Sequence, residues 1–320
     1  MQTPPLHVGA EAPVAPFEED IQRPPPRSPR QIRWTRRRLA LRRFWKAYRR
    51  DAMGVVGLII LAFFLAVAVF AIFADKSGTR ITEATGPALA PPSLEYPLGT
   101  DDQGRSVLTL TIQGAPVSLL VGLSATLITM LIGSTVGLVA GFRGGSADQV
   151  LMRITDWGLV IPWLVLAISL ASIFGQSLLI IVVVIGLTTW PSTARLVRAQ
   201  TLSVKERPYV ERARALGASS WHLVTRHVLP NVMPVIMANA VLIVAIAILS
   251  ETALSFLGLG DPFSISWGQI LEQASNGAAA TRGAWWWLGA PGVCIVLVVL
   301  AFTMIGFALD EIINPKIRER

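Results

Sequence analysis

Between two long apolar blocks of the chain lies the polar stretch ERARALGASSWHLVTRHVLP, residues 211–230. Helix-forming residues, a glycine at 217 and a proline at 230 predict two short helices, at about 209–216 and 219–227, joined by a glycine turn. Proline is compatible with the first turn of a helix, so a further helix is expected to start after Pro230. A connection that has helices and a defined turn of its own is expected to bind another protein.

The composition indicates a membrane protein with several spans. Of the 320 residues, 52% are hydrophobic and 15% are charged, with a mean hydropathy of +0.56, which leaves too little polar surface for a soluble domain. The net charge of +8 arises beside apolar segments, so anionic lipid explains it and nucleic acid is not expected as a partner. The single cysteine, Cys294, is expected to be a small buried side chain.

Apolar intervals of the roughly 20 residues that a bilayer requires predict an all-α polytopic membrane protein with six transmembrane helices. We expect these helices at 52–74, 116–141, 150–173 and 178–197, from just after Pro230 to about 250, and from near Trp287 to about 309. The chain then divides into a tail (1–32), a basic helix (33–51), the first span (52–74), an extracytoplasmic loop (75–115), a five-helix core (116–310) that contains the inner loop 198–230, and a second tail (311–320).

The distribution of lysine and arginine predicts the orientation of these spans. With the N-terminus in the cytoplasm, 24 basic residues lie on the inner side, and only Lys76, Arg80, Arg105 and Arg282 lie on the outer side. Basic residues favour the cytoplasmic side of a membrane. Both termini and the stretch 211–230 are therefore expected in the cytoplasm.

The first 50 residues form two segments of different character. Residues 1–32 are rich in proline and lack apolar periodicity, so we expect a disordered tail and not a signal peptide. From Arg33 onward, Trp34, Leu41, Trp45 and Tyr48 recur among arginines at near-helical spacing. This pattern favours a basic amphipathic helix in the inner membrane interface; a solvated basic run that only sets the topology is the alternative.

The motifs of the common catalytic and energy-converting sites are missing from the sequence. None of the four lysines stands in a phosphate-binding loop, and the three histidines have no metal-ligand spacing, so we expect neither ATP nor a metal to bind this chain. Charged residues are scarce within the spans, which disfavours a secondary transporter driven by ions. Energy for transport is expected to come from another chain.

Glu251 is the main charged residue near a span. A helix that starts at Asn231 rises about 1.5 Å per residue and places Glu251 roughly 30 Å along, near the outer surface. We expect an interfacial glutamate that caps or pairs locally, with a role as gate or substrate contact as the alternative. Residues 285–287, three consecutive tryptophans, favour a membrane-interface belt over a direct substrate contact.

The stretch 211–230 resembles the coupling motif of the permeases of ATP-binding-cassette importers: Glu-Ala-Ala, three residues, Gly, nine residues and Ile-x-Leu-Pro. The positions that match in register are Glu211, Ala213, Gly217, Leu229 and Pro230, while Arg212 and His227 replace the central alanine and the isoleucine. Further segments resemble the dipeptide, oligopeptide and nickel permeases, and among them the C-type subunit. These segments are LGTDDQGR (98–105), GAPVSL (114–119), ARLVRAQ (194–200), RHVLPN (226–231), ETALSFLGLG (251–260) and SWG (266–268). The resemblance extends over about residues 40–318.

The resemblance implies a type I importer permease fold and a non-catalytic subunit for peptide import in the plasma (inner) membrane of a prokaryote. The implied partners are a homologous second permease, two ATPase subunits that bind ATP and Mg²⁺, and an extracytoplasmic peptide-binding protein. ATPase coupling is implied for Glu211, Arg212, Ala213, Leu216, Gly217 and Pro230. Contact with the binding protein or gating is implied for Asp101, Asp102, Arg105 and Glu251, although a capped, solvated turn would equally explain the first three. Nickel or another small solute as cargo, a secondary transporter and a receptor or scaffold stay as alternatives.

Overall fold

The computed structural model describes residues 34, 38, 39, 42, 44–76 and 83–313. The chain from Trp45 onward forms one compact unit. Before it, Trp34, Arg38, Leu39 and Arg42 have helical backbone, and the guanidinium carbon of Arg38 lies 5.2 Å from the centroid of the Trp34 ring. The tail 1–32, much of the expected basic helix 33–51 and residues 314–320 of the second tail lie outside the described residues.

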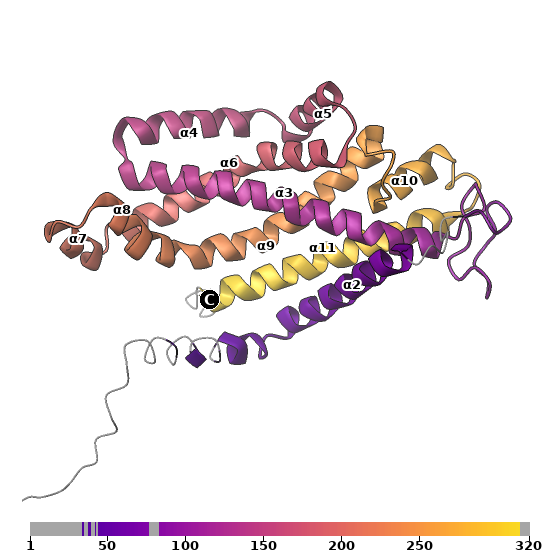
Figure 1. Ribbon diagram of the computed structural model, residues 1–320, viewed down its shortest axis with the longest axis horizontal. Coiled ribbons are helices and arrows are strands. Elements are labelled where there is room, and N and C mark those ends of the chain that lie inside the picture. Colours follow the sequence, from indigo (N-terminus) through magenta and orange to yellow (C-terminus); the bar gives the residue numbers. More distant parts are fainter. Residues whose placement is uncertain (1–33, 35–37, 40–41, 43, 77–82, 314–320) are drawn as a thin grey trace, which may run out of the picture. The chain divides into compact units, whose positions relative to one another are not determined.

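The compact unit is built from helices (Figure 1). The long helices are α2 (Ala52–Lys76), α3 (Val107–Arg143), α4 (Gly145–Val160), α5 (Trp163–Phe174), α6 (Leu178–Lys205), α9 (Leu229–Leu254) and α11 (Trp285–Ile313). The short ones are α7 (Pro208–Ala215), α8 (Ser220–Leu223), the π-helical turns η1 (Val224–Val228) and η2 (Ser255–Leu259), and α10 (Trp267–Asn276). Among the described residues, five helices are long and apolar enough to cross a membrane, and the bent pair α4 and α5 makes a sixth span if counted as one. The predicted all-α membrane fold is confirmed, with five or six candidate spans among the described residues.

The third span differs from the single helix expected at 150–173. It consists of α4 and α5, which meet at an angle of 88°. The break falls at Ile161 and Pro162, where both residues have extended ψ angles of 126° and 117°. Proline disfavours helical backbone at the preceding residue and removes a helical hydrogen bond, so the apolar run cannot continue as one straight helix.

The second span starts at Val107 and not at Pro116 as expected. Its first turns are polar, and the sequence therefore suggested a loop. The Thr111 hydroxyl, however, donates to the Val107 carbonyl at 2.7 Å, and the Trp267 indole nitrogen donates to the Thr111 carbonyl at 2.8 Å. The connection between α2 and α3 is correspondingly shorter than the expected 75–115.

The close pairing of α3 with α6 depends on three glycines of α3 at helical spacing. A β-carbon added to Gly133 would lie 2.7 Å from Thr193, one on Gly137 would lie 2.5 Å from the Ala194 carbonyl oxygen, and one on Gly141 would lie 2.8 Å from Thr201. Small residues allow helix backbones to approach closely in membranes. The sequence did not single out this contact.

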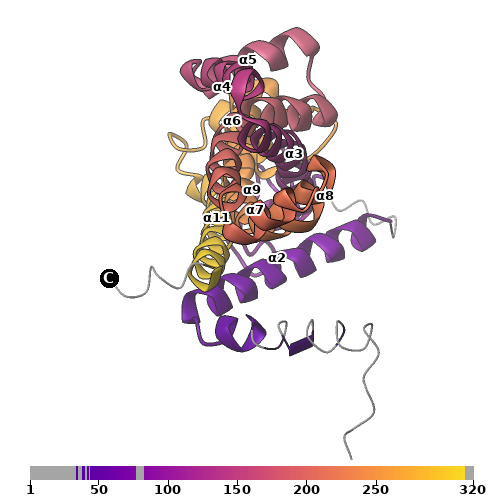
Figure 2. The ribbon, with the colours of Figure 1, turned by 90° about the vertical axis from the view of Figure 1, so that its left-hand side faces the viewer.

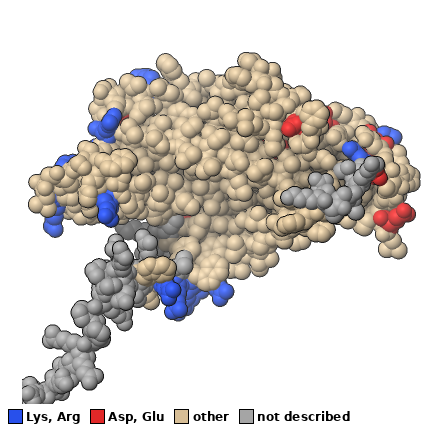
Figure 3. All heavy atoms as spheres, viewed as in Figure 1, with Lys and Arg blue, Asp and Glu red and all other residues tan. Residues whose placement is uncertain are grey.

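The two ends of the unit differ in structure and charge. The helices α7 and α8 lie at one end, and α10 and the loop before α3 lie at the other (Figures 1 and 2). On the face shown in Figure 3, basic side chains surround the α7 end and most acidic side chains lie at the α10 end. This distribution agrees with the predicted placement of residues 211–230 on the cytoplasmic side.

Candidate coupling site

The segment 208–223, here called the coupling segment, consists of α7, a glycine turn and α8. Pro208 stands at the start of α7, where its missing N–H leaves no helical bond unmade. Val210 is fully buried and anchors the helix to the unit. Glu211 and Arg212 are exposed. The helix α7 therefore packs on the unit through Val210, and its outer face is charged.

The turn after α7 requires glycine because of its backbone conformation. Gly217 has a φ of +83°, and a β-carbon added there would meet nothing within 4 Å. The Gly217 N–H donates to the Arg214 carbonyl at 3.0 Å, and the Ala218 N–H donates to the Ala213 carbonyl at 3.1 Å, the bond pattern of a Schellman cap. The glycine position predicted from sequence is thus the left-handed end of α7.

The side chains around this turn project away from the unit. Leu216 is 88% exposed and Trp221, on α8, is 77% exposed, which is unusual for large apolar side chains outside a membrane span. Ala213 is partly exposed and Pro230 is exposed. A small protruding surface with apolar and charged groups is suited to a concave partner. The sequence reasoning missed Trp221, although its position after the Ser219 cap could have indicated it.

The coupling segment is continuous with a membrane span, contrary to the prediction. The expected second short helix, 219–227, does not end before Pro230. Instead α8, η1, α9 and η2 form one helical stretch, Ser220–Leu259, of 40 residues, with a kink at Gly258 near its end. A displacement of the glycine turn can therefore be transmitted to the span without a flexible joint.

Pro230 explains the π-helical turn η1 that precedes it. A proline within an α-helix clashes with the carbonyl four residues earlier, here that of Arg226. In η1 the Leu229 N–H donates to the Val224 carbonyl, five residues back, so the helix is wider at this point. The Asn231 side chain donates to the His227 carbonyl at 2.7 Å and satisfies a further acceptor beside the proline.

At the other end, Asp101 holds the loop before α3 together. Its side chain is fully buried and accepts from the N–H groups of Gln103 (2.9 Å) and Arg105 (2.7 Å) and from Arg105 Nε (2.6 Å). A terminal nitrogen of Arg105 also donates to Gln273 of α10 at 3.0 Å. The turn is capped, as expected for the alternative of a capped, solvated turn. Asp101, however, is buried and not solvated, whereas Asp102 is exposed.

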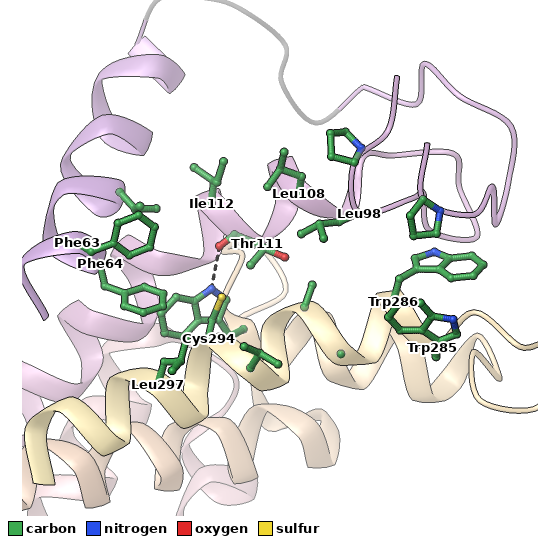
Figure 4. A pocket seen from close by; sticks show the side chains of 17 residues that line it. Phe63, Phe64, Leu98, Leu108, Thr111, Ile112, Trp285, Trp286, Cys294 and Leu297 are labelled. Carbon is green, nitrogen blue, oxygen red and sulfur yellow. Dashed lines mark hydrogen bonds between the residues drawn. The ribbon is translucent and has the colours of Figure 1, made fainter. Parts of the chain in front are cut away.

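The same loop closes one side of an apolar cavity of about 500 Å³ between α2, α3 and α11 (Figure 4). Trp285 is exposed at its edge, whereas Trp286 is largely buried and donates from its indole nitrogen to the Thr100 carbonyl at 3.1 Å. Trp287 is completely buried. The interface-belt interpretation therefore fits Trp285 alone, because the other two indoles pack inside the protein.

Glu251 lies inside the protein and not at the outer surface as expected. It is 1% exposed, and its Oε1 accepts from the Ser255 hydroxyl at 2.8 Å, a local pairing of the expected kind. Burial results from α10, which packs so closely that a β-carbon on Gly268 would lie 2.8 Å from Thr252 Cα. Ser266, the residue that caps the start of α10, lies beside the same carboxylate.

Comparison with known proteins identifies the family. The model of the "binding-protein-dependent transport system inner membrane component" family matches residues 133–319. The chain belongs to this family. The model of the "N-terminal TM domain of oligopeptide transport permease C" matches residues 40–98, which includes α2.

Relatives of this permease match it over most of its length. It is 37% identical over 277 residues to the dipeptide transport system permease protein DppC of Bacillus subtilis, covering 86% of this chain and 85% of that protein. It is 36% identical over 276 residues to the oligopeptide transport system permease protein OppC of the same organism, covering 85% and 88%.

A solved structure shares the permease fold. A chain of the MetNI methionine ABC transporter, in an inward-facing conformation, aligns with a TM-score of 0.51 and 22% identity, covering 64% of this chain and 95% of that chain. The predicted type I importer permease fold is confirmed. Among the described residues, no group of three or more His, Cys, Asp and Glu side chains could hold a metal ion.

Proposed function

We propose that this chain is the non-catalytic permease subunit of an ATP-driven importer of dipeptides or oligopeptides, in the plasma membrane of a prokaryote with both termini in the cytoplasm. The peptide assignment is supported by the relatives, which are named as dipeptide and oligopeptide permeases. The chain forms half of the translocation pathway, and a homologous second permease forms the other half. Two ATPase subunits bind ATP and Mg²⁺, and an extracytoplasmic protein delivers the peptide.

The observation that carries the proposal is the exposed glycine turn fused to a membrane span. Glu211, Arg212, Ala213, Leu216 and Gly217 form the surface that enters a cleft of an ATPase subunit. Because α8 continues into α9 without a break, closure of the ATPases moves the span as a lever. Pro230 contributes through the π-helical turn that joins the two parts.

At the outer end, the exposed Asp102 and the partly exposed Arg105 are proposed to contact the peptide-binding protein, and Asp101 to hold them in place. Glu251 is proposed as a gate residue, since it is buried under α10 and would become accessible if α10 moved. Both roles depend on movement at the end opposite to the coupling segment.

The test is Gly217→Arg in the complete transporter reconstituted in liposomes. We expect loss of peptide uptake and of peptide-stimulated ATPase activity, because a large side chain occupies the space that the ATPase cleft requires. Gly175→Arg is a matched control: Gly175 also has a positive φ, +97°, and nothing within 4 Å of an added β-carbon, but it lies between α5 and α6. Full coupled activity of Gly217→Arg would show that the turn is not the coupling site.

A further inference from the structure

A polar stripe follows one face of the transmembrane helix α6. It consists of Thr188, Ser192 and Arg195, whose spacing of four and three residues places them on the same face of a helix. Ser192 and Arg195 are exposed. At 1.5 Å per residue Ser192 lies about 21 Å from the start of this 28-residue helix, near its middle. Ser192 is therefore at membrane depth, and Arg195 lies three residues closer to the inner end of the span.

The stripe faces the broken backbone between α4 and α5. A crevice of about 310 Å³ is lined by Gly158 and Pro162 on one side and by Thr188 and Ser192 on the other. At the end of α4 the Trp157 carbonyl accepts from the Ile161 N–H at 3.4 Å, and the carbonyls after it belong to a helix terminus, where intrahelical donors are no longer available. Val160, the last residue of α4, is 79% exposed, so the break is not covered by this chain.

The break between α4 and α5 lies at a depth where its irregular backbone does not face lipid tails. Fifteen residue steps from Gly145 to Val160 correspond to about 22 Å, less than the roughly 30 Å of a hydrocarbon core. Irregular backbone at such depth is tolerated only where it is buried in protein or lines a water-filled space. The crevice is consequently either aqueous or covered by another subunit.

An ion pair next to the crevice favours water. Arg195 NH2 lies 2.7 Å from Asp156 Oδ1, and the two side chains are 55% and 46% exposed. Arg195 is three residues from Ser192, so the pair continues the stripe. Arg195 lies toward the inner end of α6, and half-exposed charges at the end of a span are costly against lipid tails and usually face water.

We propose that the polar stripe, together with Asp156 and the α4–α5 break, lines the aqueous path along which hydrated, zwitterionic peptides cross the membrane. The inference rests on the proposed function and specifies where its substrate passes. Hydroxyls and the carbonyls of a helix terminus can bind peptide amide groups whatever the side chains are, and the Asp156–Arg195 pair carries one charge for each terminus of a peptide. Discontinuous helices form substrate sites in other transporters in this way.

The experiment measures water access to the stripe in the assembled transporter. Cys294→Ala removes the single cysteine of the chain, and Ser192→Cys then introduces one thiol. Leu187→Cys is the matched control, since Leu187 is 46% exposed on the same helix but lies about 140° away from Ser192 around it. Each is treated with a charged, membrane-impermeant methanethiosulfonate.

We expect position 192 to react at least tenfold faster than position 187, and excess dipeptide to slow the reaction at 192. Equal rates at the two positions, in a transporter that takes up peptide, would overturn the proposed path and leave the proposed function intact. A different outcome is fast labelling of position 192 that dipeptide does not slow, in an assembly that takes up no peptide. This outcome would overturn peptide as the substrate, both in the proposed function and in the proposed path.

Discussion

Replacement of Asp101 by alanine should loosen the outer loop far more than its position in a short turn suggests. The carboxylate is completely buried and accepts two backbone N–H groups and the Arg105 guanidinium. Alanine leaves all three donors without this acceptor. Since removal of one partner from a buried, hydrogen-bonded ion pair costs about 3–5 kcal/mol, we expect a loss of that order, reduced by the 17% exposure of Arg105.

A series of substitutions separates the contribution of the Asp101 charge to stability from that of its hydrogen bonds. Asp101→Asn can keep Oδ1 as the acceptor of the Gln103 and Arg105 N–H groups and loses only the charged bond from Arg105, for which about 1.5–3 kcal/mol is expected. The exposed neighbour Asp102 makes none of these bonds, so Asp102→Ala should change the stability by no more than about 0.5 kcal/mol.

Two measurements on the purified chain in mixed micelles test this order. Denaturant unfolding should rank the variants as wild type and Asp102→Ala, then Asp101→Asn, then Asp101→Ala. Hydrogen exchange should show that the Gln103 and Arg105 amides lose protection in Asp101→Ala and keep it in Asp102→Ala. The reasoning is refuted if Asp101→Ala and Asp102→Ala have the same stability and the same amide protection.

Other perturbations test the packing and the coupling segment. Gly137→Ala should destabilise the protein by about 1–3 kcal/mol because its methyl group would meet a backbone carbonyl, whereas Gly292→Ala, in open space on α11, should be neutral or stabilising by up to about 1 kcal/mol; denaturant unfolding measures both. Val210→Asp should detach α7 and speed tryptic cleavage within it at least about tenfold, because burial of a valine contributes about 1.5–3 kcal/mol, and an unchanged cleavage rate would show that Val210 is not the anchor. Pro230→Ala should allow η1 to become α-helical, which turns α8 relative to α9 and lowers peptide-stimulated ATPase activity; unimpaired coupling would contradict the role given to the π-helical turn.

The spans and the coupling turn could be predicted from the sequence because each depends on a local signal. Apolar length determines a span, and Gly217 is required by its own left-handed backbone. Glu251 could not be placed in this way. Its distance along α9 suggested the surface, but α10, a separate element, folds over it. When a separate helix covers a residue, as α10 covers Glu251, the sequence around that residue does not indicate that it is buried.

The two prolines 162 and 230 show why helix breaks were the least predictable feature. Both are preceded by helix and both remove a backbone donor, yet the chain bends by 88° at Pro162 and passes Pro230 in one continuous helix. The difference lies in the backbone around each proline. At Pro230 the helix continues, because the Leu229 N–H donates to the Val224 carbonyl in a π-helical turn and the Asn231 side chain donates to the His227 carbonyl. At Pro162 the backbone opens instead onto the crevice beside Ser192, where, on our proposal, water and passing peptides supply the missing hydrogen bonds. The sequence reveals where a donor is absent, but only the surroundings of that point decide between a wider helical turn and a break.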